Sequence, residues 1–149
     1  IQYSIIVSYR CDAMNQYYKQ NYTKERISSV LDTILDCVRE KRYIISKNQN
    51  RQENKDFIKE YNLTSKKQRD ILLKIEPEDF CHTLQNTNLG FEHEVLYVFC
   101  PQIMLFNFSG EEELVDVYTK FNIIDVEKEK RVVVISFHKR NKPIDYCFR

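Results

Sequence analysis

The feature that most limits the fold of this chain is an alternating segment, "LVDVYTKFNII", followed after a short polar break by "VVVISFHK". Alternation with a period of two is typical of a β-strand that has one buried face. The two segments therefore predict an antiparallel hairpin. Its core face is expected to carry Val115, Val117, Thr119, Phe121 and Ile123, and its other face Asp116, Tyr118, Lys120 and Asn122.

The hairpin register follows from the same pattern. A symmetric break at "DVEKEK" gives the pairs Ile124 with Val132, Asn122 with Val134, Lys120 with Ser136, and Tyr118 with His138. Residues directly opposite each other share a face, with Cβ atoms within about 5.5 Å. A slip by one residue would expose Phe121 and bury Lys120, so the pattern favours this register. His138 is then expected beside Tyr118 on an open polar face.

Helical patterns precede the hairpin. One apolar stripe begins after Thr23, a predicted N-cap, and contains Ile27, Val30, Leu31, Ile34, Leu35 and Val38. "LTSKKQRDILLKI" predicts a second helix, capped by Thr64 or Ser65, and a helical turn is expected around Phe57. "EPEDFCHTLQN" predicts a short third helix with Pro77 at its first position, from which His82 points away from the core. "SKNQNRQENK" is polar and is expected to be a loop.

After Gly90 the pattern changes to strands. "EVLYVFC", "QIMLFNF" and "IDYCF" are rich in β-branched and aromatic residues and join the two hairpin segments. Helices first and strands afterwards predict an α+β fold, with N-terminal helices packed on one face of a C-terminal antiparallel β-sheet. We expect one domain over residues 23–149. Residues 1–22 are expected to be an extension, with translation beginning either upstream of Ile1 or at Met14.

The composition narrows the functional classes. Five cysteines without a C-x-x-C pair argue against a disulfide framework and predict a cytoplasmic protein. No apolar run is long enough to span a bilayer, and the first residues do not form a secretion signal. The chain contains no phosphate-binding loop, dinucleotide fingerprint, G-x-S-x-G or H-E-x-x-H motif. We therefore expect no cofactor and no metal site.

The net charge of +1 conceals an asymmetry along the chain. Residues 1–75 contain 15 Lys/Arg and 9 Asp/Glu, whereas residues 76–149 contain 8 and 13. The basic first half is compatible with a nucleic-acid partner, although the total charge is far below that of a strongly basic nucleic-acid-binding domain.

The polar hairpin face combines residue types that suit RNA cleavage. RNA supplies its own nucleophile, the 2′-OH, so a protein needs a base, an acid and cations for the pentavalent phosphorane. His138 suits either proton-transfer role, Tyr118 can bond the phosphate, and Lys120 is on the same face, with Lys139 and Arg140 nearby. Each histidine also has an ordinary interpretation: His138 as a polar strand end, His82 as a surface residue, and His93 as a strand-entry residue.

Three segments together resemble a known family. "LTSKKQRDILLKIEPEDF", the strand "VDVYTKFNII" and the strand "VVVISFHK" are similar in order to the MqsR-type (motility quorum-sensing regulator) toxins of bacterial type II toxin–antitoxin systems. The resemblance covers roughly residues 24–140. It implies a RelE-like or microbial-RNase-like fold and the activity of an mRNA endoribonuclease. The segment 98–112 and the last predicted strand have no clear counterpart in the family.

The resemblance also implies particular site residues. Two lysine positions that the family uses in catalysis fall on His82 and His138, and its active-site tyrosine falls on Tyr118. A glutamine of the family falls on His93 or Glu94. Histidine in place of lysine implies proton transfer between two imidazoles.

The sequence and the resemblance together predict a metal-independent endoribonuclease toxin that cuts single-stranded mRNA and leaves a 2′,3′-cyclic phosphate. His82 and His138 are the expected acid and base, in either order, with Tyr118 orienting the phosphate and His93 assisting. Phosphates of the backbone would be held by Lys120, Lys139 and Arg140. The implied partner is a cognate antitoxin, for which a helix-turn-helix DNA-binding domain is one expected form. The alternative is a non-catalytic RNA- or protein-binding regulator on a ribonuclease-like fold.

Overall fold

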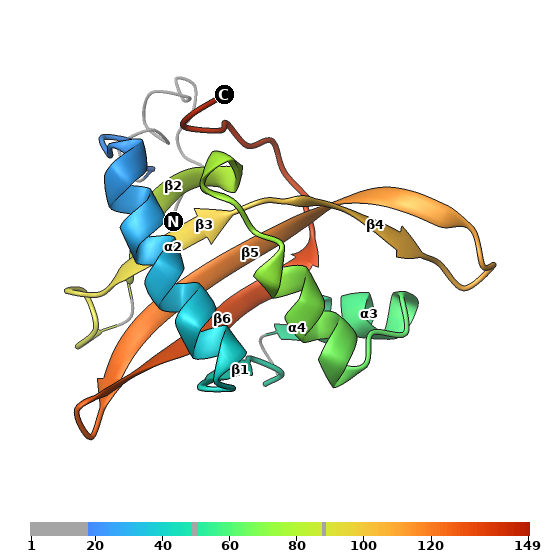
Figure 1. Ribbon diagram of the computed structural model, residues 1–149, viewed down its shortest axis with the longest axis horizontal. Coiled ribbons are helices and arrows are strands. Elements are labelled where there is room, and N and C mark those ends of the chain that lie inside the picture. Colours follow the sequence, from blue (N-terminus) through green and yellow to red (C-terminus); the bar gives the residue numbers. More distant parts are fainter. Residues whose placement is uncertain (1–17, 49–50, 88) are drawn as a thin grey trace.

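The computed structural model describes residues 18–48, 51–87 and 89–149. Within them, three α-helices pack on a six-stranded, mostly antiparallel sheet (Figure 1). The predicted α+β class is therefore confirmed. Residues 1–17 of the predicted N-terminal extension lie outside the described residues. Residues 18–22 contact the sheet, since Lys19 bridges to Thr83 and the Tyr22 hydroxyl lies 2.9 Å from the Thr83 hydroxyl.

The helices begin largely where capping residues predict. Helix α2 (Lys24–Arg39) follows Thr23, whose hydroxyl accepts a bond from the Arg26 amide. Helix α4 (Ser65–Leu73) is capped in the same way by Thr64. Helix α3 (Gln52–Glu60) begins inside the stretch predicted to be a loop, so that prediction is wrong from Gln52 onward. None of the helices in the described ranges is long and apolar enough to cross a membrane.

The strands follow the order β1-β6-β5-β3-β2, and β4 pairs with residues 112–116 at the start of β5. Their bounds are β1 Tyr43–Ile45, β2 Phe80–Gln85, β3 Val95–Phe99, β4 Gln102–Phe106, β5 Glu112–Val126 and β6 Glu129–Lys139. All pairs are antiparallel except β1 with β6. The short parallel strand β1, between α2 and α3, was not predicted.

Two predicted elements are wrong. The third helix ends after a single 3-10 turn, η2 (Pro77–Asp79), and the chain continues as strand β2. Phe80 is fully buried and pairs with Phe99, so pairing with β3 outweighs the helical signals at Pro77. His82 is consequently a strand residue. The segment "IDYCF" forms no strand and crosses the sheet as irregular chain, with the Cys147 amide donating to the Phe80 carbonyl.

The β5–β6 hairpin has the predicted register at one end only. Tyr118 pairs with His138 and Lys120 with Ser136, as predicted. Nearer the turn the pairs are Asn122 with Val133 and Ile124 with Arg131, so the predicted pairs of Asn122 with Val134 and Ile124 with Val132 are wrong. A β-bulge that leaves Ile135 unpaired separates the two registers. Without the bulge, Val132 and Val134 would face away from the core.

The helices and one face of the sheet enclose the main core. This core unites α2, α3 and α4 with β1–β6 and includes Ile27, Ile34, Val38, Phe57, Leu72, Phe80, Phe99, Val117, Phe121, Val132, Val134 and Phe137. The predicted core face of β5 lies here, with Phe121 fully buried.

The opposite face of the sheet is covered as well. A smaller cluster of Cys81, Val98, Cys100 and Tyr118 lies there, and Ile144 and Tyr146 of the C-terminal segment pack on it. Tyr118, His138 and His82 are only 3%, 8% and 5% exposed. The prediction of an open polar face is therefore wrong.

Candidate functional site

The covered face brings together several predicted site residues. Tyr118 on β5 and His138 on β6 are paired, and their rings stack with centroids 5.4 Å apart at 23°. Lys120 is two residues further along β5 on the same face. His82 pairs with Val98, which pairs with Lys120, so His82 lies in the same row two strands away. We call Tyr118, Lys120, His138 and His82 the β-face cluster.

The backbone fixes the tautomer of His138. Its Nδ1 lies 2.8 Å from the Lys139 carbonyl oxygen, and because a carbonyl can only accept, Nδ1 carries the hydrogen and donates. The neutral ring therefore has its lone pair on Nε2, which is the atom a general base needs. Nε2 is 3.9 Å from a carboxylate oxygen of Glu53 on α3. That carboxylate can stabilise the imidazolium after a proton is taken up.

Lys120 is a strongly desolvated cation. Its pKa is lowered to about 8, mainly by burial and in addition by the nearby charges of Lys142 and Arg51, against a smaller opposing effect of Glu53. A lysine with a pKa near neutrality can donate a proton at physiological pH far more readily than a solvated lysine. Within the described residues, Lys120 forms no ion pair. Its environment is thus poorly suited to a cation unless an anion binds beside it.

His82 is a second buried polar group that is not satisfied. Its pKa is lowered to about 4, mainly by burial and in addition by the charges of Lys142 and Lys120, so the imidazole is neutral at physiological pH. Its Nε2 atom makes no hydrogen bond in the described part of the chain. The ring contacts Tyr18, with centroids 4.3 Å apart. A buried nitrogen without a partner is costly and points to a ligand or a substrate group.

Two cations that the sequence analysis did not single out for the site complete the cluster. Lys142 Nζ lies 5.4 Å from the centroid of the Tyr118 ring. Arg51 stands at the N-cap position of α3 and acts electrostatically on Lys120. Neither side chain forms an ion pair with any residue that the structure describes. The basic run after His138 was a signal for Lys142, whereas Arg51 lies in a stretch that looked like a loop.

The other two predicted phosphate ligands, Lys139 and Arg140, form ion pairs within the protein. Lys139 lies on the opposite side of β6 from His138, where it bonds Glu60 at 2.8 Å, and that carboxylate raises the lysine pKa. Arg140 bonds Asp116 at 3.1 Å. Lys120 therefore remains a candidate phosphate ligand. Lys139 lies away from the β-face cluster, and Arg140 is ion-paired with Asp116.

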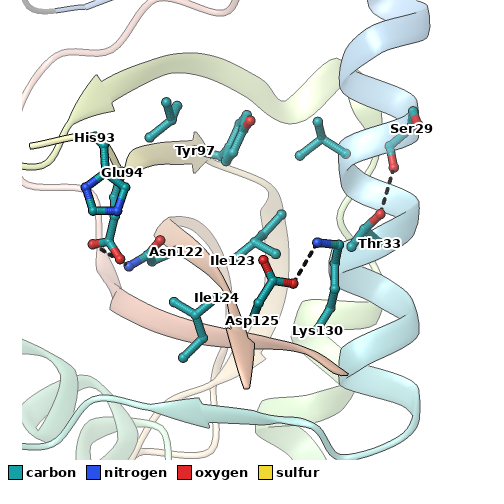
Figure 2. A pocket seen from close by; sticks show the side chains of 12 residues that line it. Ser29, Thr33, His93, Glu94, Tyr97, Asn122, Ile123, Ile124, Asp125 and Lys130 are labelled. Atoms are coloured by element: carbon teal, nitrogen blue, oxygen red, sulfur yellow. Dashed lines mark hydrogen bonds and ion pairs between the residues drawn. The ribbon is translucent and has the colours of Figure 1, made fainter. Parts of the chain in front are cut away.

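His93 is separated from the β-face cluster. It is exposed and lines a hollow of about 630 Å³ between α2 and the turn end of β3, β5 and β6 (Figure 2). Glu94 in the same hollow accepts bonds from Asn122 at 3.0 Å and from Asn86 at 2.9 Å. The predicted gathering of three histidines is thus wrong for His93, which no contact links to Tyr118 or His138.

The cysteines on this face are buried. Burial raises the pKa of Cys100 to about 12 and also raises that of Cys81, so both thiols stay protonated and are poor nucleophiles. In the described ranges, no group of three His, Cys, Asp or Glu side chains is placed to hold a metal ion. The reactive groups gathered here are imidazoles, a phenol, amines and the Glu53 carboxylate.

Comparison of the chain with protein-family models, with curated proteins and with solved structures finds no match.

Proposed function

We propose that this chain is the toxin of a toxin–antitoxin pair and acts in the cytoplasm as a metal-independent endoribonuclease on single-stranded mRNA. The observation that carries the proposal is the β-face cluster, in which Lys120 is desolvated among cations and the Nε2 atom of His82 has no partner within the described residues. A phosphodiester would neutralise the cations and accept hydrogen bonds from them. The resemblance to MqsR-type toxins supports the same activity.

The positions of the side chains suggest a division of roles. His138 Nε2, with its lone pair, takes the proton of the 2′-OH, and the oxygen attacks the phosphorus to form the 2′,3′-cyclic phosphate. Lys120 gives a proton to the departing 5′ oxygen. Tyr118 and Lys142 hold the non-bridging oxygens of the phosphorane.

Lys120 replaces His82 as the partner of His138 because of distance. Strands β2 and β6 are separated by β3 and β5, so three strand spacings put their backbones about 14 Å apart. Lys120 is a diagonal neighbour of His138 on adjacent strands, about 7–8 Å away between Cα atoms. His82 then contributes a neutral hydrogen-bonding group for the neighbouring nucleotide.

The burial of Tyr118 and His138 sets a condition on the mechanism. Ile144 and Tyr146 pack on the apolar cluster that includes Tyr118, and His138 beside it is only 8% exposed. The mechanism therefore requires part of the covering chain to move before a phosphodiester can reach these side chains. Tyr146 is held there by a 2.6 Å bond from its hydroxyl to the Cys100 carbonyl.

The test is cleavage of a long, unstructured RNA, with sequencing of the 5′-hydroxyl ends. We expect His138→Ala and Lys120→Met each to reduce the cleavage rate by about 10²–10⁴-fold. Lys66→Met is the matched control, because Lys66 is exposed on α4 and pairs only with Asp70. RNA carrying a 2′-deoxy sugar at the cut site should be inert. Cleavage of that RNA, or full activity of both site variants, would refute the mechanism.

The cover over the site also favours a second candidate function, a non-catalytic regulator that binds RNA or protein on a ribonuclease-like fold. The observation is that Tyr118 is only 3% exposed, which is unusual for a residue that must meet substrate. This candidate predicts RNA binding with no 5′-hydroxyl ends at any pH from 5 to 9. The cleavage assay therefore separates the two.

A further inference from the structure

An apolar surface lies on the strand pair that projects from the body of the molecule. Residues 102–116, which comprise β4 and the first part of β5, form this projecting pair, here called the arm (Figure 1). Met104, Phe106, Phe108 and Leu114 are 49%, 64%, 75% and 61% exposed. These four side chains are defined as the arm patch.

Alternation along the strands explains how the patch arises. Ile103, Leu105 and Val115 point inward and belong to the main core. The residues between them point outward, and Met104 pairs directly with Leu114, so these two side chains lie next to each other. Met104, Phe106 and Leu114 thus share one face of the two-stranded sheet, and Phe108 lies in the turn that joins the two strands.

Strand β4 also has an open edge. It pairs with β5 on one side and, within the described ranges, with no strand on the other. An edge strand with exposed apolar side chains readily accepts another strand, and most proteins protect such edges with charged residues, proline or a cover. β4 contains neither a charged residue nor a proline. The edge and the patch together favour addition of a strand from a partner.

The charge of the arm indicates which partner fits. Residues 101–116 contain four carboxylates and no Lys, Arg or His. Glu113 is bonded by Tyr61 and Asn107, and Asp116 by Arg140 and Gln102.

The remaining carboxylates, Glu111 and Glu112, form no ion pair with other described residues and flank Phe106 and Phe108. They oppose the approach of RNA or of a second copy of the arm, and they attract a basic segment.

We propose that β4 is a docking edge for a basic, amphipathic β-strand of another protein. Apolar side chains of that strand would cover the arm patch, and its Lys or Arg side chains would pair with Glu111 and Glu112. The arm would bind this partner whether or not the chain cleaves RNA, so failure of one proposal leaves the other standing.

The binding test uses blocked, fluorescent ten-residue peptides in which Val alternates with Lys or with Glu. Fluorescence anisotropy should show that the Lys peptide binds at least about tenfold more tightly than the Glu peptide, a difference of about 1.4 kcal/mol. Phe106→Ser should weaken binding of the Lys peptide by at least about tenfold. Glu111→Gln with Glu112→Gln should weaken it and reduce its salt dependence. Because these positions are exposed, the variants should fold normally.

A peptide with N-methyl groups on one edge separates strand pairing from simple charge attraction. It keeps every side chain but cannot donate hydrogen bonds to β4, so its binding should be largely lost. Equal binding of the methylated and unmethylated peptides would overturn the proposal. So would equal binding of the Lys and Glu peptides. A wild-type dimer in sedimentation that Phe106→Ser converts to monomer would identify a second copy as the occupant and would also overturn it.

Discussion

The two faces of strand β5 differ in how uniform their side chains are in burial and in chemical type. On one face, Val115, Val117, Thr119 and Phe121 are all buried, three of them in the core shared with the helices. On the other, the residues change from exposed Leu114 through the ion-paired Asp116 and the stacked Tyr118 to the desolvated Lys120. One face of the strand thus contributes to the core, whereas the chemical character of the other face changes along its length.

This contrast shows which part of the molecule contains groups that lower the stability of the fold. The helix-covered face consists almost entirely of apolar side chains in contact with one another. The second face keeps a cation among cations at Lys120 and an imidazole with an unsatisfied nitrogen at His82. Unfavourable groups of this kind are concentrated at functional sites, because binding requires them and folding alone would remove them.

The largest effect on stability should come from the uniform face. Phe121→Ala removes a fully buried ring that contacts Phe99 at 6.0 Å between centroids. We expect the free energy of unfolding to fall by about 3–5 kcal/mol in urea denaturation. A loss below about 1 kcal/mol would mean that this face is not the main source of stability.

A smaller effect should appear on the mixed face when the pH falls. The pKa of His82 is about 4 in the folded protein against 6.5 for an unperturbed histidine, so the unfolded chain binds more protons between these values. The wild type should therefore lose up to about 3 kcal/mol between pH 6.5 and pH 4 that His82→Gln does not lose. Urea denaturation at several pH values measures the difference, and the shared carboxylates cancel. Parallel curves for the two proteins would show that His82 is not desolvated.

Lys120→Met should increase the free energy of unfolding, and this effect should be the smallest of the three. Because burial lowers the lysine pKa to about 8, the charged form is disfavoured in the folded state below that pH. The variant should be more stable than the wild type by about 1–3 kcal/mol at pH 7. The advantage should shrink between pH 8 and 10.5, where the wild-type lysine loses its proton in the fold first. A destabilised variant at pH 7 would show that Lys120 has a compensating anion within the protein.

The sequence predicted the β5–β6 pairing where side-chain alternation determines it. Tyr118 and His138 face each other because both belong to the polar side of long alternating segments. The pairing near the turn was not predictable, because Glu127 and Lys128 adopt positive φ angles of 53° and 68° without glycine or asparagine. Such residues do not signal a two-residue turn, and the compensating bulge at Ile135 has no sequence signature either.

The grouping of the candidate site residues was predicted in part for a similar reason. A residue's place along a strand follows from local alternation, which is why Tyr118, Lys120 and His138 were assigned to one face. His82 lies on that face because its segment forms strand β2, although the local sequence signals predicted a helix. Arg51 and Glu53 reach it because α3 packs beside β6, a tertiary contact that a polar stretch does not reveal.

Asn54 on α3 links two parts of the molecule that the sequence keeps far apart. It is fully buried, accepts a bond from the Phe137 amide at 2.8 Å and donates to the Ile135 carbonyl at 3.0 Å. One side-chain amide thus holds the backbone at the bulged residue and at Phe137, the residue before His138. Helix α3 therefore acts on His138 in two ways, through the Glu53 carboxylate beside the imidazole and through the backbone that Asn54 holds next to it.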